Sequence, residues 1–275
     1  GIFGTPGAGK STLLETIVDG IDADAIVLGL IGERGREAER WIARCNPRTT
    51  IVCATSDRTA AERIAAANTA FVQANALARR GMHVVIVLDS LARVAYALRE
   101  MGTSTGEPLG RGGYPAGTFA SIARLVEAAG SFRCGSISLI ATILNDGDDN
   151  DPASEAARSL LDGHVQLSAK LAQAGHFPAI DILASASRTM DEVVSGDHRN
   201  AAAHVRGALA TLAASEDARA LGIEPGDARI QAAIAAQPAI DSLLRQGRGP
   251  AAPARTLAML FETADTLREP HEYRL

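Results

Sequence analysis

The sequence has few aromatic residues, few cysteines and almost no lysine. Aromatic residues make up 4% of its 275 residues, and there is a single tryptophan. The three cysteines are odd in number and lack the spacing of metal ligands, which excludes a disulfide framework and predicts reduced, mostly buried thiols. No run of eighteen apolar residues occurs, so the sequence predicts no segment that spans a membrane.

The balance of charge and the start of the chain narrow the class of protein. The formal net charge is −5, which argues against a general nucleic-acid binder. There is no initiator methionine and no signal peptide, and the reduced thiols predict a cytoplasmic protein. The chain starts one step before a motif that needs a preceding strand, so we expect further residues upstream.

Short apolar runs without polar alternation recur along the first two thirds of the chain. Runs rich in Val, Ile and Leu are typical of parallel strands that are covered on both faces. The sequence predicts such strands at residues 25–32, 50–55, 83–90, 136–144 and 179–185.

Helical stretches separate these predicted strands and follow the last of them. Residues 59–81 read as a helix that ends on Gly81. Alternation of strand and helix indicates βαβ units, an α/β fold and a mainly parallel sheet. After about residue 190 the strands stop, and residues 200–221 and 229–246 read as helices. We therefore predict an α/β domain at 1–190 and a small helical domain at 191–275.

The glycine-rich loop at residues 4–12 reads GTPGAGKST. Glycines let backbone N–H groups cradle phosphate oxygens, and the helix expected next presents its positive N-terminal end to the same anion. The loop fits the pattern G-x-x-x-x-G-K-[ST] at Gly4, Thr5, Pro6, Gly7, Ala8, Gly9, Lys10 and Ser11.

The polar side chains of this loop have roles in nucleotide binding. Lys10, one of only two lysines in the chain, would reach the β- and γ-phosphates. Ser11 would hold Mg²⁺ through its hydroxyl, and Thr12 could contact the α-phosphate. The alternative is a glycine-rich turn that binds nothing. The strand before the loop and the helix after it favour a nucleotide site.

Asp89 ends the apolar run 83–90 and is the second candidate ligand of Mg²⁺. A carboxylate in this position would hold the metal through a water in its coordination shell. The alternative role for Asp89 is to cap the helix that begins LARVAYAL. The apolar strand before it favours the metal role.

Glu33 comes just past the end of the predicted strand 25–32. Ligands of open α/β sheets lie at the carboxyl ends of strands, where a carboxylate could orient and deprotonate an attacking water. Because Arg34, Arg36 and Glu37 follow at once, the alternative is a solvated, charged loop. These residues alone leave both interpretations open.

Taken together, several stretches resemble one family. The type III secretion and flagellar protein-export ATPases, relatives of the catalytic β subunit of rotary ATP synthases, show these motifs in the same order. The resemblance spans about residues 1–195 and is weaker to the end. It rests on GTPGAGKST, LIGERGRE, VIVLDSLARVAYALRE, GEPLGRGGYP, DDNDPASEAARSLLDGHVQLSAKLA and GHFPAIDILASASRTM.

The resemblance implies roles for single residues. Glu33 matches the catalytic carboxylate, and Arg188 matches an arginine finger that reaches the nucleotide of the neighbouring subunit. Arg34 and Arg93 match basic residues around the phosphates. Phe177 matches the aromatic position that stacks on adenine. Without the resemblance, Arg188 reads as a surface arginine and Phe177 as a core residue.

The resemblance also implies the fold and the assembly. It predicts a RecA-like P-loop core, a homohexameric ring and Mg²⁺-dependent ATP hydrolysis that drives protein export. The ring would sit peripherally at the cytoplasmic face of the inner membrane, with central stalk and stator proteins as partners and no nucleic acid. It would release chaperones from secretion substrates and unfold them. Residues 106–115 look like the segment that lines the central pore, and an N-terminal β-barrel domain would lie upstream.

The sequence departs from the family pattern in two places. The segment DGDDNDP at 146–152 is one residue shorter than the family pattern, in a loop that faces the nucleotide interface. In the C-terminal region RALGIEPGDARIQAAI is also shorter, and Gln231 stands about where the family has an aspartate. Relatives engage chaperones and cargo there, so partner specificity follows least directly from the resemblance.

Three alternatives remain beside a virulence-type exporter. An RNA translocase would share the loop, the glutamate and the finger, but it needs basic pore loops, and Arg111 is the single arginine of the pore candidate. A nucleotide-bound docking ring would bind without hydrolysis. A flagellar exporter would share all of these motifs, and the divergent C-terminal region favours the virulence-type system over it.

Overall fold

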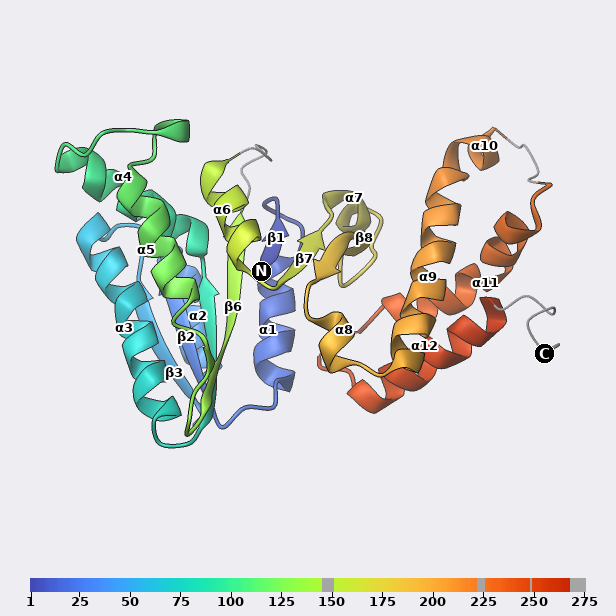
Figure 1. Cartoon of the computed structure of the whole chain (residues 1–275), viewed down its shortest axis with the longest axis horizontal. Coiled ribbons are helices and arrows are strands. Elements are labelled where there is room, and N and C mark those ends of the chain that lie inside the picture. The colour runs from blue at the N-terminus through green and yellow to red at the C-terminus, as the bar shows by residue number, and fades with distance from the viewer. Residues whose placement is uncertain (145–150, 222–225, 248, 268–275) are drawn as a thin grey trace. The chain divides into compact units, whose positions relative to one another are not determined.

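The computed structural model describes residues 1–144, 151–221, 226–247 and 249–267 (Figure 1). Residue contacts divide the chain into two compact units. The first unit comprises Gly1–Pro6 and Ile21–His164, and the second comprises Gly7–Gly20 and Val165–Leu275. The glycine-rich loop therefore begins in the first unit and ends in the second. The predicted domain boundary at residue 190 stays a prediction.

In the described residues, eight strands form one mostly parallel sheet in the order β3-β2-β4-β6-β1-β7-β8, with β5 paired to β6. The five predicted strands are confirmed to within two residues at each end, as β2, β3, β4, β6 and β8. The strand expected before the glycine-rich loop is confirmed as β1, whereas β5 and β7 were not predicted as strands. The strands are β1 (Ile2–Gly4), β2 (Ala25–Ile31), β3 (Thr49–Ala54), β4 (His83–Asp89), β5 (Gly130–Ser131), β6 (Ser136–Leu144), β7 (Gly163–Leu167) and β8 (Ile180–Ser187).

Burial along the strands follows their place in the sheet. Every residue of β2 is buried, and β2 pairs in parallel with β3 on one side and β4 on the other. Strand β3 has a single buried residue, Ala54, because it lies at an edge of the sheet. The runs at β2 and β4 are therefore doubly covered central strands, as the sequence predicts. The same prediction is wrong for β3 and β8, which lie at the two edges of the sheet and are mostly not buried.

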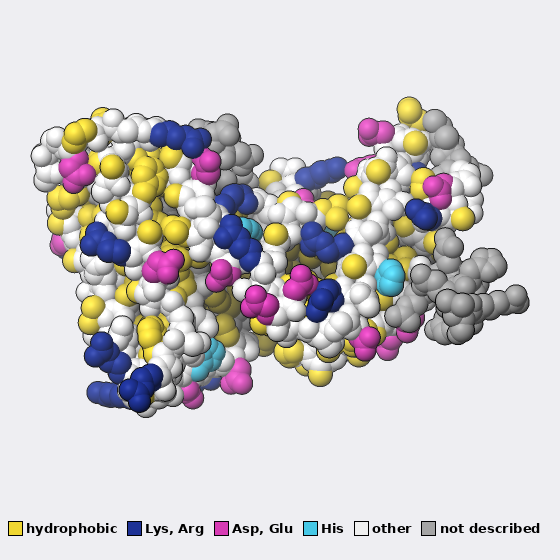
Figure 2. Space-filling view, in the orientation of Figure 1, with side chains coloured by type: hydrophobic (Ala, Val, Ile, Leu, Met, Phe, Trp, Pro, Cys, Tyr) yellow, Lys and Arg dark blue, Asp and Glu magenta, His cyan; other side chains and the backbone are white. Residues whose placement is uncertain are grey.

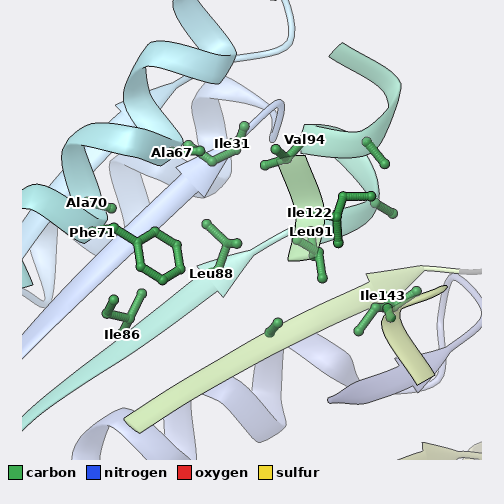
Figure 3. Close-up of a cluster of buried hydrophobic side chains, with 14 of the residues drawn as sticks. Ile31, Ala67, Ala70, Phe71, Ile86, Leu88, Leu91, Val94, Ile122 and Ile143 are labelled. Carbon is green, nitrogen blue, oxygen red and sulfur yellow. The ribbon is translucent and has the colours of Figure 1, made fainter. Parts of the chain in front are cut away.

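Helices of the first unit cover the sheet and enclose the main hydrophobic core. Alanines of α3, among them Ala67 and Ala70, pack with Phe71 against Ile86 and Leu88 of β4 (Figure 3). Small side chains on that face let the helix approach the sheet closely. The helices of this unit are α2 (Gly35–Ala43), α3 (Ala60–Ala78), α4 (Leu91–Ser104), α5 (Ala116–Val126) and α6 (Pro152–Leu160), with a 3₁₀ turn, η1 (Arg111–Gly113).

The ends of α3 show which local signals the sequence carries. Thr59 caps the helix and forms a capping box with Glu62, so the predicted start is confirmed. The predicted end at Gly81 is wrong, because the helix ends at Ala78 with Arg79 as its C-cap. Gly81 lies beyond it with φ +92°, a left-handed conformation that favours glycine, and donates to the Ala78 carbonyl at 2.9 Å.

The second unit contains the helical C-terminal region that the sequence predicts. Its apolar centre includes Ala208 of α9, and Ala233, Ala236 and Ile240 of α11. The helices are α1 (Lys10–Gly20), α7 (Ala169–Gln173), α8 (Met190–Val193), α9 (Gly196–Ala214), α10 (Glu216–Ala220), α11 (Ala228–Leu244) and α12 (Pro253–Leu267).

The surface corrects one prediction about the cysteines. Cys45, Cys53 and Cys134 are free, as expected, but all three are exposed, so the expectation of mostly buried thiols is wrong. On the face shown in Figure 2, acidic and basic side chains are interspersed over both units. Among the helices of the described residues, none has the length and apolar character needed to cross a membrane.

Candidate functional site

Parallel strands of the first unit end together at one edge of the sheet. Gly4 of β1 pairs in register with Leu144 of β6, and Leu30 of β2 pairs with Asp89 of β4. Glu33 therefore follows the register partner of Asp89 by three residues. Because the carboxyl ends of parallel strands are where open α/β sheets hold their ligands, this edge is the candidate site of the first unit.

The glycine-rich loop has the backbone that phosphate binding needs. Gly7 and Gly9 have φ values of +86° and +88°, in the left-handed region that favours glycine. Lys10 is the first residue of α1, and the N–H of Leu13 donates to the carbonyl of Gly9 at 3.0 Å. Lys10, Ser11 and Thr12 therefore form the first turn of α1, and the positive end of the helix dipole at this turn attracts an anion.

Asp89 lies at the end of β4 and is 3% exposed. The Thr142 hydroxyl donates a hydrogen bond of 2.7 Å to Oδ1 of Asp89, so a buried side chain fixes the carboxylate. The alternative role of Asp89 as a helix cap is wrong. The cap of α4 is Ser90, whose hydroxyl accepts from the Arg93 N–H at 3.3 Å.

Glu33 is buried, at 6% exposure, although charged residues follow it. Arg34 is the N-cap residue of α2, and both it and Arg36 are exposed. The alternative interpretation, a solvated charged loop, therefore fits Arg34 and Arg36 but not Glu33. A carboxylate that burial holds at a strand end is suited to act on one water molecule.

Gly32 brings Arg93 next to the turn that carries Glu33. Gly32 has φ +71°, and a Cβ atom at this position would lie 3.1 Å from Cβ of Arg93 and 3.4 Å from its Cδ. The stem of Arg93 therefore packs directly on the Gly32 backbone. In the first unit the structure thus brings together Glu33, Asp89 and Arg93, and it leaves Arg34 on the outside.

Phe177 lines a pocket of about 340 Å³ in the second unit. Phe177 is 48% exposed, so the alternative role as a core residue is wrong. A Cβ atom on Gly9 would lie 3.7 Å from Cε1 of Phe177, which places the ring beside the phosphate loop. A nucleotide needs this combination of an anion site and an apolar slot. The pocket is lined by Gly9, Thr12, Leu13, Thr16, Leu167, Phe177, Pro178, Ala179, Gln246 and Gly247.

Hydrogen bonds from two other segments hold the stretch that carries Phe177. The Gln246 N–H donates to the carbonyl of Phe177 at 2.9 Å, and the His176 N–H donates to that of Leu171 at 2.9 Å. Burial, and then the Arg245 guanidinium, lower the pKa of His176 below its usual value of 6.5. The imidazole beside Phe177 is therefore mainly neutral at pH 7.

Arg188 follows the end of β8 and is exposed on the second unit. This location permits the predicted contact with a neighbouring subunit. In the same unit the structure brings Gly9 and Thr12 of the loop together with Phe177, since all three line one pocket. The second unit thus holds Phe177, predicted to stack on the base, and the part of the phosphate loop from Gly7 onward.

The donor atoms of the predicted metal ligands fit Mg²⁺. Ser11 offers a hydroxyl and Asp89 a carboxylate, and Mg²⁺ prefers such hard oxygen ligands together with substrate phosphates. Within the described ranges there is no group of three His, Cys, Asp or Glu that could hold a metal. Hard oxygen ligands of this kind suit a metal that also binds the phosphates of a nucleotide.

The pore candidate at 106–115 contacts the start of α6. The Tyr114 hydroxyl donates to Asp151 at 2.9 Å, and Arg111 forms an ion pair of 2.8 Å with Glu155. Asp151 also caps α6. Residues 146–150 of the shortened segment 146–152 lie outside the described residues. Gln231 lies in α11, whereas residues 222–225 of the divergent C-terminal stretch are also outside.

Sequence reasoning missed two residues that the geometry makes relevant. Thr142 holds Asp89, and its only signal is a hydroxyl within the otherwise apolar stretch 139–144. Gln246 was included in the predicted helix 229–246, but α11 ends at Leu244. Gln246 therefore lies in the following loop, where it lines the pocket of Phe177. No sequence signal placed it there.

Comparison with family models matches almost the whole chain. The model described as ATP synthase alpha/beta family, nucleotide-binding domain, matches residues 1–187. The model described as T3SS EscN ATPase C-terminal domain matches residues 194–262. The predicted resemblance and the predicted RecA-like α/β fold are therefore confirmed.

Similar proteins carry matching names. A type 3 secretion system ATPase of Pseudomonas syringae pv. tomato is 43% identical over 98% of this chain and 62% of its own length. A flagellum-specific ATP synthase of Treponema pallidum is 43% identical over 90% of this chain and 57% of its own. The chain thus spans about three fifths of the length of these curated relatives.

A solved structure is similar along the chain as well. The assembled ATPase EscN of enteropathogenic E. coli, in complex with its central stalk EscO, has a TM-score of 0.88 and 39% identity. The match covers 96% of this chain and 65% of that one.

Proposed function

Because the chain belongs to the ATP synthase alpha/beta family, we propose that it hydrolyses Mg²⁺-bound ATP to energise type III protein secretion. One observation carries the proposal. Glu33 is buried and comes three residues after Leu30, the register partner of Asp89. It lies at the edge of the sheet where β1 ends and the phosphate loop begins. A site that only binds nucleotide has no need of a buried carboxylate in addition to a metal ligand.

The phosphate loop binds the polyphosphate of ATP. Backbone N–H groups around Gly7 and Gly9 face the phosphate oxygens, and Lys10 neutralises the β- and γ-phosphates. Thr12 contacts the α-phosphate. Ser11 and Asp89 would hold Mg²⁺, which would supply positive charge beside the transferred phosphoryl group. Phe177 stacks on adenine.

Glu33 orients and deprotonates the attacking water, while Arg34 and Arg93 support the charge around the phosphates. Arg188 acts in the site of the neighbouring subunit, as an arginine finger. Its exposed position after β8 supports a role across a subunit boundary. We therefore propose a homohexameric ring that is active only when assembled.

The partners are those of an export motor. The similar EscN structure is assembled and contains a central stalk, which supports a central stalk partner here. We propose that the ring works in the cytoplasm at the face of the inner membrane, with stator proteins around it. It releases chaperones from secretion substrates and unfolds them, and residues 106–115 line its pore.

A flagellar exporter is the second candidate function. A flagellum-specific relative has the same identity to the chain, 43%, as the secretion ATPase of Pseudomonas syringae pv. tomato. The match of residues 194–262 to the EscN C-terminal model favours secretion, because that model is named for a type III secretion ATPase.

The decisive experiment measures ATP turnover per subunit against protein concentration. The wild-type protein should show a steep rise, because a neighbour completes each site. The turnover of Arg188→Ala should not rise with protein concentration. At high concentration it should be about 10³-fold or more below that of the wild type, whereas ATP binding should remain. Glu33→Gln should bind ATP without turnover.

Arg199→Ala is the matched control. Arg199 is another arginine near the surface, and its ion pair of 3.1 Å with exposed Asp191 contributes little. The turnover of Arg199→Ala should depend on protein concentration in the same way as that of the wild type. ATP binding without turnover at any concentration would instead support a nucleotide-bound docking ring. Turnover that rises only on addition of RNA would support an RNA translocase.

A further inference from the structure

The pocket of Phe177 contains three polar side chains among its lining residues. They are Thr12, Thr16 and Gln246, and the rest of the lining is glycine, proline or apolar. Polar groups in a mainly apolar pocket fix the orientation and identity of a ligand. The hydrogen bonds that these three side chains donate or accept would therefore decide which base the pocket binds.

Gln246 is fixed by two hydrogen bonds. Its backbone N–H donates to the carbonyl of Phe177 at 2.9 Å, so the loop that carries Gln246 is tied to the stacking residue. Its side-chain Nε2 donates to the carbonyl of Gly249 at 2.6 Å. Because only the nitrogen of an amide can donate, this bond sets which end of the amide faces Gly249.

One of the two N–H groups of Gln246 and the hydroxyl proton of Thr16 are already committed. The Nε2 group of Gln246 faces Gly249, which leaves Oε1, an acceptor, at the other end of the amide. The hydroxyl of Thr16 donates to the carbonyl of Thr12 at 3.0 Å, so its oxygen also keeps only acceptor capacity for a ligand. Two of the three polar side chains thus offer acceptors.

We propose that Gln246 selects adenine by accepting a hydrogen bond at Oε1 from the 6-amino group of the base. This inference rests on the proposed function of the site, and it adds a residue that determines specificity. Adenine has a donor at position 6, whereas guanine and hypoxanthine have a carbonyl oxygen there. A 6-oxo purine would set one acceptor against another and leave both without a proton.

The amide of Gln246 cannot simply turn over to fit a 6-oxo purine. Rotation would place Oε1 against the carbonyl of Gly249 and would lose the bond of 2.6 Å. Binding of a 6-oxo purine therefore loses a hydrogen bond in either orientation of the Gln246 amide. We expect ATP to bind about tenfold more tightly than ITP, which differs from ATP only in its 6-oxo purine.

The test compares equilibrium binding of Mg²⁺-ATP and Mg²⁺-ITP, measured by displacement of a fluorescent nucleotide, with turnover as a second readout. Gln246→Met keeps the length of the side chain and removes both amide groups. It should weaken the binding of ATP, so that the affinities for ATP and ITP differ by less than about twofold.

Gln237→Met is the matched control. Gln237 accepts a hydrogen bond from Arg219 at 3.3 Å and does not line the pocket of Phe177. The ratio of ATP affinity to ITP affinity in Gln237→Met should therefore equal that of the wild type. An unchanged ratio in Gln246→Met, with binding intact, would overturn this inference alone. Equal wild-type affinity for ATP and ITP would also overturn it, without any variant. A wild-type protein that binds neither nucleotide would overturn the proposed function as well.

Discussion

The hydroxyl of Thr142 donates a hydrogen bond of 2.7 Å to Oδ1 of Asp89, and both side chains are almost fully buried. The bond joins β6 to β4 at the edge of the sheet where the proposed site lies. A buried hydroxyl paired with a carboxylate limits which oxygen of Asp89 can face a metal. Thr142 therefore acts as a positioning residue for Asp89.

Thr142→Val should destabilise the protein and weaken its use of Mg²⁺. Valine has the same shape but cannot donate, so a buried carboxylate oxygen loses its partner, at a cost of about 1–3 kcal/mol. Urea unfolding should report that loss, and the Mg²⁺ concentration for half-maximal turnover should rise. Thr142→Ser keeps the hydroxyl and should restore the Mg²⁺ dependence. If valine changes stability but leaves the Mg²⁺ dependence as it was, Thr142 has only a structural role.

The sequence predicts the sheet well because burial acts on whole strands. Strands β2, β4 and β6 are continuous apolar runs that only a doubly covered sheet accommodates, and their positions follow directly. Strand β7 was missed because its residues are mostly half-buried and carry polar side chains such as Gln166. Its partners in the sheet, not its own composition, make it a strand.

The residues of the candidate site also fall into those that the sequence predicts and those that it does not. The loop residues are recognisable because chemistry fixes both their type and their spacing along the chain. Glu33 is singled out by the family resemblance, because its neighbours alone leave a solvated loop open. Thr142 and Gln246 are not, because each acts through a partner far away in sequence, Asp89 and Phe177. The exposure of the three cysteines likewise depends on which strand edges and loops they occupy, and composition does not carry that information.

Gly32→Ala should disturb the turn that carries Glu33. Gly32 has φ +71°, and an added Cβ would meet Cβ of Arg93 at 3.1 Å. Backbone strain of this kind costs about 1–3 kcal/mol, and the displacement of Glu33 should lower turnover more than ATP affinity. Gly35→Ala is the control, because nothing lies within 4 Å of an added Cβ there. Equal turnover in the two variants would contradict the prediction.

Lys10→Ala should weaken ATP binding by about 10- to 150-fold, the range for loss of a hydrogen bond to a charged group. The chain offers an unusual control, since Lys170 is its only other lysine. Lys170 forms an exposed ion pair of 3.2 Å with Glu216, so its removal should change stability by less than about 1 kcal/mol. Titration calorimetry of both variants with Mg²⁺-ATP separates the specific role from a general loss of positive charge.

Tyr114→Phe should change how stability depends on pH. Tyr114 is buried and donates to Asp151 at 2.9 Å. Burial, and then this hydrogen bond, raise the pKa of Tyr114 well above its usual value of 10.0, so the folded protein keeps the phenol neutral. The unfolded chain ionises near pH 10, and it then binds fewer protons than the folded state. The stability that Tyr114 provides is therefore fully present below about pH 10 and is lost as the pH rises further.

The measurement is urea unfolding of wild type and Tyr114→Phe at about pH 8 and about pH 11. At the lower pH the wild type should be more stable by about 0.5–3 kcal/mol, because phenylalanine removes the hydrogen bond and leaves Asp151 with one partner fewer. At the higher pH this advantage should shrink or reverse, since phenylalanine has no proton to lose. A difference that is the same at both pH values would show that Tyr114 titrates alike in the folded and unfolded chains, and the burial argument would then fail.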